Sequence, residues 1–220
     1  MTMDYFGHPF SSYTWKGEIA LIEKGADYRF RIIGDDQPET MAELRAAWPV
    51  GQFPLLKHGE VALFEASIIV EYVDRLLPGG PQLIPGDPDA ALEVRLLDRV
   101  FDNHFQARFQ AVVGEYLPFI TETPDPVRIA RARDLLEKAY AWLEPRLGES
   151  EWATPHGFTL ADCAAAPALF YADWVHPIAA RFANLKAYRA RLLARPSVVQ
   201  CVEAAQPYRH YFPLGAPDRD

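Results

Sequence analysis

The sequence predicts a small α/β domain followed by an all-helical domain. Apolar runs typical of strands occur only in the first third of the chain, where they alternate with helix-like segments. Residues 77–88 (LPGGPQLIPGDP) hold four prolines and three glycines and have the composition of a linker. Beyond them apolar residues recur at helical spacing. We therefore expect a first domain at 1–77, a linker at 78–88 and an all-α domain at 89–220.

The first domain is expected to alternate strands and helices. A hairpin turn at 57–60 contains Gly59, and Gly25 closes the first helix, both at places where a positive φ is useful. The expected order is a strand at 3–6, a helix at 12–24, a strand at 28–33, a helix at 39–47, two strands within 53–64 and a helix at 65–76. This order is that of a thioredoxin-like α/β layer.

The second domain is expected to consist of helices alone. In order they span 89–116, 126–147, 159–174, 181–194 and 196–205. The segment at 159–174 is the most apolar, so it should lie at the centre. Thr159 and Asp162 have the spacing of a capping box at its start, which we interpret as structural.

Composition excludes several classes of function. The net charge is −8 and the pI is about 5.3, which disfavours nucleic acids and anionic membranes as partners. No apolar run approaches the length of a transmembrane helix, and no secretory signal is evident. Cys163 and Cys201 offer neither a disulfide framework nor a metal spacing, and we predict no metal site. A cytoplasmic setting is expected.

The stretch 52–72 (QFPLLKHGEVALFEASIIVEY) suggests a peptide-binding edge. Pro54 opens a strand and leaves Phe53 extended, with backbone groups that can pair outside the sheet. A helix then begins at Glu65, Ala66 and Ser67, and its first N–H groups lack intrahelical partners. An extended backbone beside an open helix N-terminus suits a small peptide that carries a carboxylate.

This pattern resembles the glutathione-binding half of the glutathione S-transferases, and the similarity extends over nearly the whole chain. The resemblance implies that glutathione is the co-substrate and that Phe53–Pro54 is a cis peptide. It further implies a glutathione site formed by Ser11, Gln52, Phe53, Pro54, Glu65, Ala66 and Ser67. Glu65 would hold the γ-glutamyl amine. The family has serine where this chain has Ala66, and loss of one hydrogen bond to a charged group weakens binding about ten- to a hundredfold.

Ser11 permits two interpretations. Serine is among the best helix N-caps, and Ser11 directly precedes the first helix. In the serine-type classes, a serine at this place directs its hydroxyl to the glutathione sulfur, so the resemblance makes Ser11 the catalytic residue. Ser12, Tyr13 and Tyr5 are alternatives, and the run from Ser11 is similar to that of zeta and theta classes.

The resemblance also implies a hydrophobic substrate site along the long helix after the linker. Its candidates are Phe105, Phe109, Tyr116 and Trp174, although a stripe of phenylalanines is more often core. The leading hypothesis is a homodimeric, detoxifying glutathione transferase that attacks a small apolar electrophile. The alternatives are a non-catalytic binding or scaffold protein on the same fold and a glutathione-dependent isomerase, lyase or dehalogenase.

Overall fold

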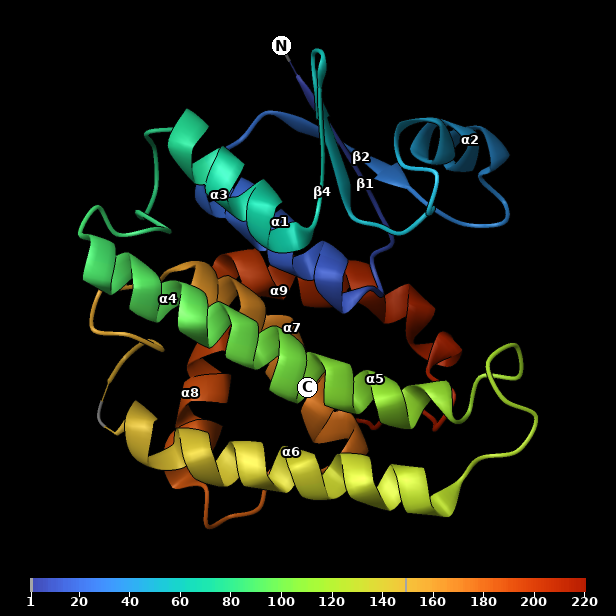
Figure 1. The fold of residues 1–220 in the computed structure, drawn as a ribbon, viewed down its shortest axis with the longest axis vertical. Helices are drawn as coiled ribbons and strands as arrows, with labels where there is room; N and C mark the ends of the chain where they lie inside the picture. Colours follow the sequence, from blue (N-terminus) through green and yellow to red (C-terminus); the bar gives the residue numbers. More distant parts are fainter. Residues whose placement is uncertain (1, 149) are drawn as a thin grey trace.

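The computed structural model describes residues 2–148 and 150–220. Figure 1 shows a sheet flanked by helices at the top and a group of helices packed beneath it. Within the described residues, strands occur only before residue 65 and helices fill most of the rest. The fold is therefore a thioredoxin-like α/β domain with a helical C-terminal domain, as the sequence predicts.

The sheet contains four strands in the order β2-β1-β3-β4. The strands span Met3–Gly7 (β1), Tyr28–Ile32 (β2), Leu55–His58 (β3) and Val61–Phe64 (β4). β1 pairs in parallel with β2 through Tyr5 and Phe30, whereas β3 runs antiparallel to both of its neighbours. The antiparallel β3–β4 hairpin is the predicted turn unit of residues 53–64.

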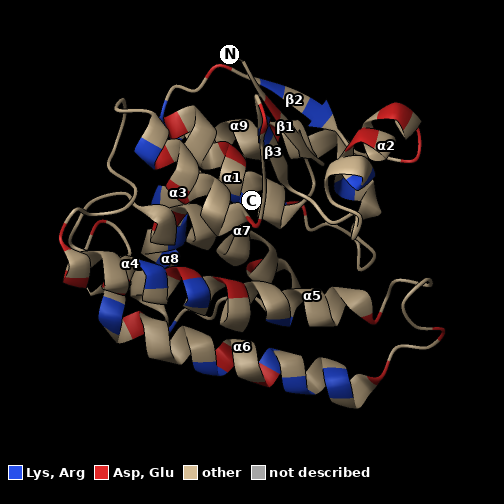
Figure 2. Cartoon of the chain, turned by 45° about the horizontal axis from the view of Figure 1, so that its top comes forward, with Lys and Arg blue, Asp and Glu red and all other residues tan. Residues whose placement is uncertain are grey.

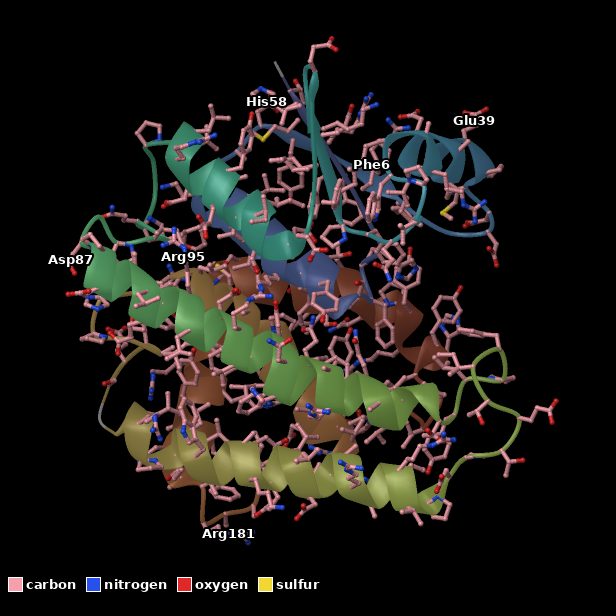
Figure 3. All side chains as sticks on the ribbon, in the orientation of Figure 1. Phe6, Glu39, His58, Asp87, Arg95 and Arg181 are labelled. Carbon is pink, nitrogen blue, oxygen red and sulfur yellow. The ribbon has the colours of Figure 1, made fainter. Side chains whose placement is uncertain are left out.

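Helices cover both faces of the sheet. α1 (Ser12–Glu23) and α3 (Ala66–Leu76) pack on the face that carries Tyr5 and Leu56. α2 (Pro38–Ala47) places Leu44 against Phe6 on the other face, where Figure 3 labels Phe6. Side chains alternate between faces along a strand, so Tyr5 and Phe6 belong to different layers of the core.

The second domain is arranged around α7 (Leu160–Val175), every residue of which is buried. Its other α-helices are α4 (Pro88–Val100), α5 (Ala107–Gly114), α6 (Pro126–Leu147), α8 (Ala183–Leu193) and α9 (Pro196–Ala205). Asp162 Oδ2 accepts hydrogen bonds from the backbone N–H and the hydroxyl of Thr159, at 2.9 and 3.1 Å. The predicted central helix and its capping box are confirmed.

Two features differ from the prediction. The single long helix expected at 89–116 is divided by a π-helical segment, Phe101–Gln106, between α4 and α5. A short 3₁₀ helix, Gln206–Tyr211, follows α9 and was not predicted. The apolar spacing of Phe101 and Phe105 suits either kind of helix, so periodicity alone does not distinguish them.

The largest hydrophobic cluster extends from the first domain into the second. Trp15 and Ile19 from α1 belong to the same cluster as Phe105 and the side chains of α7. Most charged residues lie outside this cluster, and Figure 2 shows positions of acidic and basic residues alternating along α4 and α6. No helix in the described chain is long and apolar enough to cross a membrane.

Candidate active site

A cavity of about 650 Å³ lies between the first domain and the start of the helical domain. From the first domain it is lined by Ser11, Tyr13, Trp48, Gly51, Gln52, Phe53, Pro54, Phe64, Glu65 and Ala66. From the helical domain it is lined by Arg99, Asp102, Asn103 and Gln110. The structure therefore brings together six of the seven residues of the predicted glutathione site; Ser67 does not line this cavity.

The backbone of the cavity has two unusual conformations. The Phe53–Pro54 peptide is cis, as the family resemblance implied. Glu65 has a φ of 75°, and it is the one described non-glycine residue with a positive φ. A positive φ is energetically unfavourable for a residue with a side chain, and such conformations are concentrated at binding and active sites. Glu65, immediately before α3, has this conformation.

Ser11 is the N-cap of α1, and its Oγ accepts a hydrogen bond from the backbone N–H of Thr14 at 3.3 Å. Because a hydroxyl can accept and donate at once, capping leaves the Ser11 O–H available as a donor. The two interpretations of Ser11 are thus compatible. Trp15 Nε1 donates to the Pro9 carbonyl at 2.6 Å, and the Tyr171 hydroxyl donates to the Phe10 carbonyl at 2.9 Å, which fixes the loop before Ser11.

The alternatives to Ser11 occupy different positions. Tyr13 lines the main cavity, and burial raises the pKa of its phenol, with the carboxylate of Asp102 adding to the effect. Ser12 is 5% exposed and does not line this cavity. Tyr5 is fully buried and donates to the Thr14 carbonyl at 2.7 Å, so its hydroxyl is occupied in the core.

A second, more apolar cavity of about 400 Å³ adjoins the first. Ser11 and Gln110 line both cavities, while Phe109 and Tyr171 line only the second. The remaining lining residues are Phe10, Ser12, Val113, Gly114, Leu117, Ile120, Tyr211, Phe212 and Pro213. Ser11 therefore stands where a polar and an apolar space meet.

The four predicted hydrophobic-site residues are placed differently from one another. Phe109 lines the apolar cavity. Phe105 is fully buried and packs on Phe101 and Tyr140, so it is a core residue. Trp174 is 8% exposed within an aromatic cluster, and Tyr116 is 37% exposed; neither lines the two cavities.

A charged cluster supports the cavity wall, with Lys16, Asp98 and Asp102 buried and Arg99 at its exposed edge. We define it as Lys16, Ser67, Asp98, Arg99 and Asp102. Lys16 is fully buried, with its Nζ 2.5 Å from Asp98 Oδ1, 2.7 Å from Asp102 Oδ2 and 2.8 Å from the Ser67 Oγ. Ser67 donates to Asp98 Oδ2 at 2.9 Å and also bonds to Arg99.

The sequence analysis missed this cluster, together with a stacked aromatic pair in the cavity wall. Charged residues on an amphipathic helix are usually solvated, and nothing in the helical period marks these as buried. Trp48 and Phe64 stack with ring centroids 3.9 Å apart and planes 9° apart. Trp48 lies outside the stretch 52–72, and Phe64 within it has the pattern of an ordinary strand residue, so the sequence contains no signal for their pairing.

The cysteines lie away from both cavities. Cys163 and Cys201 are free and buried, and burial raises the pKa of each thiol well above its usual range. In the parts of the chain that the structure describes, no group of three or more metal-ligating side chains occurs.

The fold and the cavity define a class: a two-domain thioredoxin-like protein with a hydroxyl at the N-terminus of α1 and a cis-proline edge opposite it. Two family models match, "Glutathione S-transferase, N-terminal domain" over residues 1–75 and "Glutathione S-transferase, C-terminal domain" over residues 126–191. Glutathione S-transferase 3 of Zea mays is 31% identical over 214 residues, covering 90% of this chain and 92% of that protein. The chain belongs to the glutathione S-transferase family.

Other similar proteins include a relative with a different name and two solved glutathione S-transferase structures. A stringent starvation protein A homolog of Coxiella burnetii is 30% identical over 169 residues, or 76% of this chain and 75% of that protein. A solved glutathione S-transferase of Methylobacillus flagellatus with glutathione bound has a TM-score of 0.79 and 24% identity, covering 91% of this chain and 98% of that one. Glutathione S-transferase III in apo form has a TM-score of 0.78 and covers 99% of this chain and 100% of that one at 24% identity.

Proposed function

We propose that this protein is a serine-type glutathione transferase, in which Ser11 stabilises the thiolate of glutathione for attack on a small apolar electrophile. The observation that carries the proposal is that Ser11 lines both the polar and the apolar cavity. A thiolate beside the Ser11 hydroxyl faces the apolar space, where an electrophile finds Phe109 and Tyr171 as walls.

The chemistry required of Ser11 is modest in energy. A free thiol has a pKa of about 8.5, so only a small fraction is thiolate at neutral pH. Each unit by which the pKa falls needs about 1.4 kcal/mol of preferential stabilisation of the thiolate. One donated hydrogen bond at the N-terminus of α1 is of the right size for one or two such units. The thiol proton leaves to solvent, and the sulfur electron pair forms the new S–C bond as the electrophile's π bond opens and takes up a proton from solvent, or as its leaving group departs with the bonding electron pair.

The tripeptide is proposed to lie along the cis-proline edge. Phe53 offers its extended backbone to the cysteinyl unit, and Gln52 lies beside it in the lining. The γ-glutamyl unit then reaches the N-terminus of α3, where the Ala66 N–H donates to its carboxylate and Glu65 accepts from its amine.

A homodimer is part of the proposal. Ile68 on α3 is 49% exposed, and Leu92 and Leu96 on α4 are 66% and 57% exposed. The two helices are joined beside these residues by the Arg95–Glu71 ion pair, and Figure 3 labels Arg95 at this junction. Exposed apolar side chains on adjoining elements are typical of protein interfaces.

A second candidate is a non-catalytic binding or scaffold protein on this fold. Two observations favour keeping it: Ala66 lacks the hydroxyl found in the family, and a relative of comparable identity is named stringent starvation protein A homolog rather than transferase. A glutathione-dependent isomerase, lyase or dehalogenase needs the same thiolate, so the electrophile alone separates it from a transferase.

Calorimetric titration with glutathione is the first test, followed by ultraviolet titration of the bound thiolate against pH. We expect Ser11→Ala to raise the pKa of bound glutathione by about one to two units and to lower kcat/KM at neutral pH about ten- to a hundredfold. Its matched control is Ser12→Ala, because Ser12 lines only the apolar cavity. Absence of glutathione binding by the unaltered protein refutes the proposal, and an unchanged thiol pKa in Ser11→Ala refutes the role of Ser11.

A further inference from the structure

The position of Ala66 raises a question about how the γ-glutamyl head group is held. Its α-carboxylate loses the hydroxyl donor that a serine at position 66 supplies. The cavity nevertheless contains another hydrogen-bond donor near this position, the cationic side chain of Arg99, which lines it together with Glu65 and Ala66.

Arg99 is held in a fixed orientation by its neighbours. Its Nε and one terminal nitrogen donate to Asp98 Oδ2 at 2.9 and 2.7 Å, and that terminal nitrogen also contacts Ser67 and Asp102. The other terminal nitrogen has no hydrogen-bond partner among the described residues. A guanidinium carries five N–H donors in a planar fork, so Arg99 retains donors for a ligand carboxylate.

The same place holds an unsatisfied acceptor. Asp102 is 6% exposed and lines the cavity, and its Oδ1 has no hydrogen-bond partner among the described residues. Burial raises the pKa of its carboxyl, partly against the effect of Lys16. This oxygen is itself covered by protein and does not open onto the cavity. The exposed carboxylate of Glu65, which lines the cavity, is the group suited to accept from an ammonium group.

Arg99 and Asp102 are three positions apart, so one turn of helix presents both side chains on the same face. Arg99 lies at the end of α4, and Asp102 and Asn103 lie within Phe101–Gln106. π-helical turns are rare and often occur at functional sites. Arg99, Asp102 and Asn103 thus lie in the same cavity wall, beside the N-terminus of α3, where Arg99 contacts Ser67.

Charge balance indicates what kind of ligand fits. Lys16 and Arg99 carry two positive charges, which Asp98 and Asp102 balance, and Glu65 adds one negative charge at the cavity. A zwitterionic α-amino-acid head group adds no net charge to this balance. It offers one carboxylate for Arg99 and one ammonium for Glu65.

We propose that Arg99 replaces the hydroxyl absent at Ala66 and binds the α-carboxylate of the γ-glutamyl unit, while the Glu65 carboxylate accepts from its ammonium group. Recognition of the tripeptide then depends on the helical domain of the same chain. This inference rests on the proposed function, since it concerns the ligand of the same site. It also means that Ala66 does not by itself imply weak binding.

The test compares two ligands on the full-length protein by calorimetry. One is glutathione, and the other is 4-aminobutanoyl-cysteinylglycine, which lacks only the α-carboxylate. We expect Arg99→Gln to weaken glutathione binding about ten- to a hundredfold. The same variant should change the affinity for the analogue by no more than about twofold. Arg99→Lys keeps the charge without the fork and should give an intermediate loss for glutathione alone.

Two further variants sharpen the comparison. Ala66→Ser should restore part of the glutathione affinity of Arg99→Gln while adding little to the unaltered protein. Arg95→Gln is the matched control, because Arg95 lies one turn earlier on α4, is paired with Glu71 and does not line the main cavity. It should leave both affinities unchanged.

The outcomes separate the two proposals. If the unaltered protein does not bind glutathione, the proposed function fails and this inference fails with it. If glutathione binds but both Arg99 variants lose equal affinity for the two ligands, or lose none, the proposed function stands and the role of Arg99 is overturned.

Discussion

Replacing Lys16 with methionine tests whether the charged cluster holds the two domains together. Lys16 is on α1 of the first domain, whereas Asp98 and Asp102 belong to the helical domain. The side chain of Lys16 is 0% exposed, and those of Asp98 and Asp102 are 3% and 8% exposed. The pairs are therefore shielded from solvent and little affected by salt.

The expected loss follows from what remains after the substitution. Methionine fills much of the space, but both carboxylates stay buried with Arg99 as their remaining cationic partner. Removing one member of a buried ion pair typically costs about 3–5 kcal/mol, because the uncompensated charge stays desolvated. We expect Lys16→Met to lower the free energy of unfolding by that amount.

The assay is urea-induced unfolding followed by circular dichroism and tryptophan fluorescence, with coincident transitions as the check for two-state behaviour. Lys138→Met is the matched control, because Lys138 pairs with Asp134 on the surface of α6 with side chains 69% and 59% exposed. An exposed pair of this kind contributes at most about 0.5 kcal/mol.

A third protein isolates the cause of the loss. Adding Asp98→Asn and Asp102→Asn to Lys16→Met removes the uncompensated charges and should recover much of the stability. Two outcomes would refute the reasoning that Lys16 compensates the buried charges of Asp98 and Asp102. One is a loss of no more than about 1 kcal/mol in Lys16→Met, and the other is a triple variant that is less stable than Lys16→Met.

Two more predictions concern the α1 face and the proposed dimer. Burial raises the pKa of Glu18 from 4.5 to about 7, although Tyr28 donates a hydrogen bond to it at 3.1 Å. The folded protein then keeps a proton that the unfolded chain releases between those pH values, so this group lowers stability as pH rises through that window. Glu18→Gln should raise the unfolding free energy by about 1–3 kcal/mol at about pH 8 and by much less near pH 4.5, and equal gains in urea melts at both pH values would contradict the assignment. Leu92→Glu with Leu96→Glu should convert a dimer to a monomer in light scattering, and an unchanged mass would exclude this face as the interface.

The order of elements was predictable from the sequence because each leaves a local pattern. Each of these signals is local, because it involves residues only a few positions apart in the sequence. Examples are the strand and helix periods, Gly25 and Gly59 at turns, and the capping box at Thr159. The cis-proline edge was predictable by family resemblance, and the structure confirms it at Phe53–Pro54. These features need no knowledge of what packs against them.

The helical wall of the cavity was not predictable in this way. Phe105 and Phe109 continue one stripe in the sequence, but the π-helical segment lies between α4 and α5, and only Phe109 reaches a cavity. Lys16 and Asp98 look like ordinary charged residues of amphipathic helices. These residues are buried because the two domains pack against each other, and no local sequence pattern indicates which residues lie at that interface.

The contact of Tyr171 with the loop before Ser11 gives the helical domain influence over reactivity. Tyr171 lies in α7, 160 positions after Ser11, yet its hydroxyl holds the carbonyl of Phe10 while its ring lines the apolar cavity. In the proposed mechanism, one side chain thus touches the space for the electrophile and orients the segment that presents the Ser11 hydroxyl. Substitution of residues around α7 is then expected to alter which electrophiles react and how fast, while the cis-proline edge stays as it is.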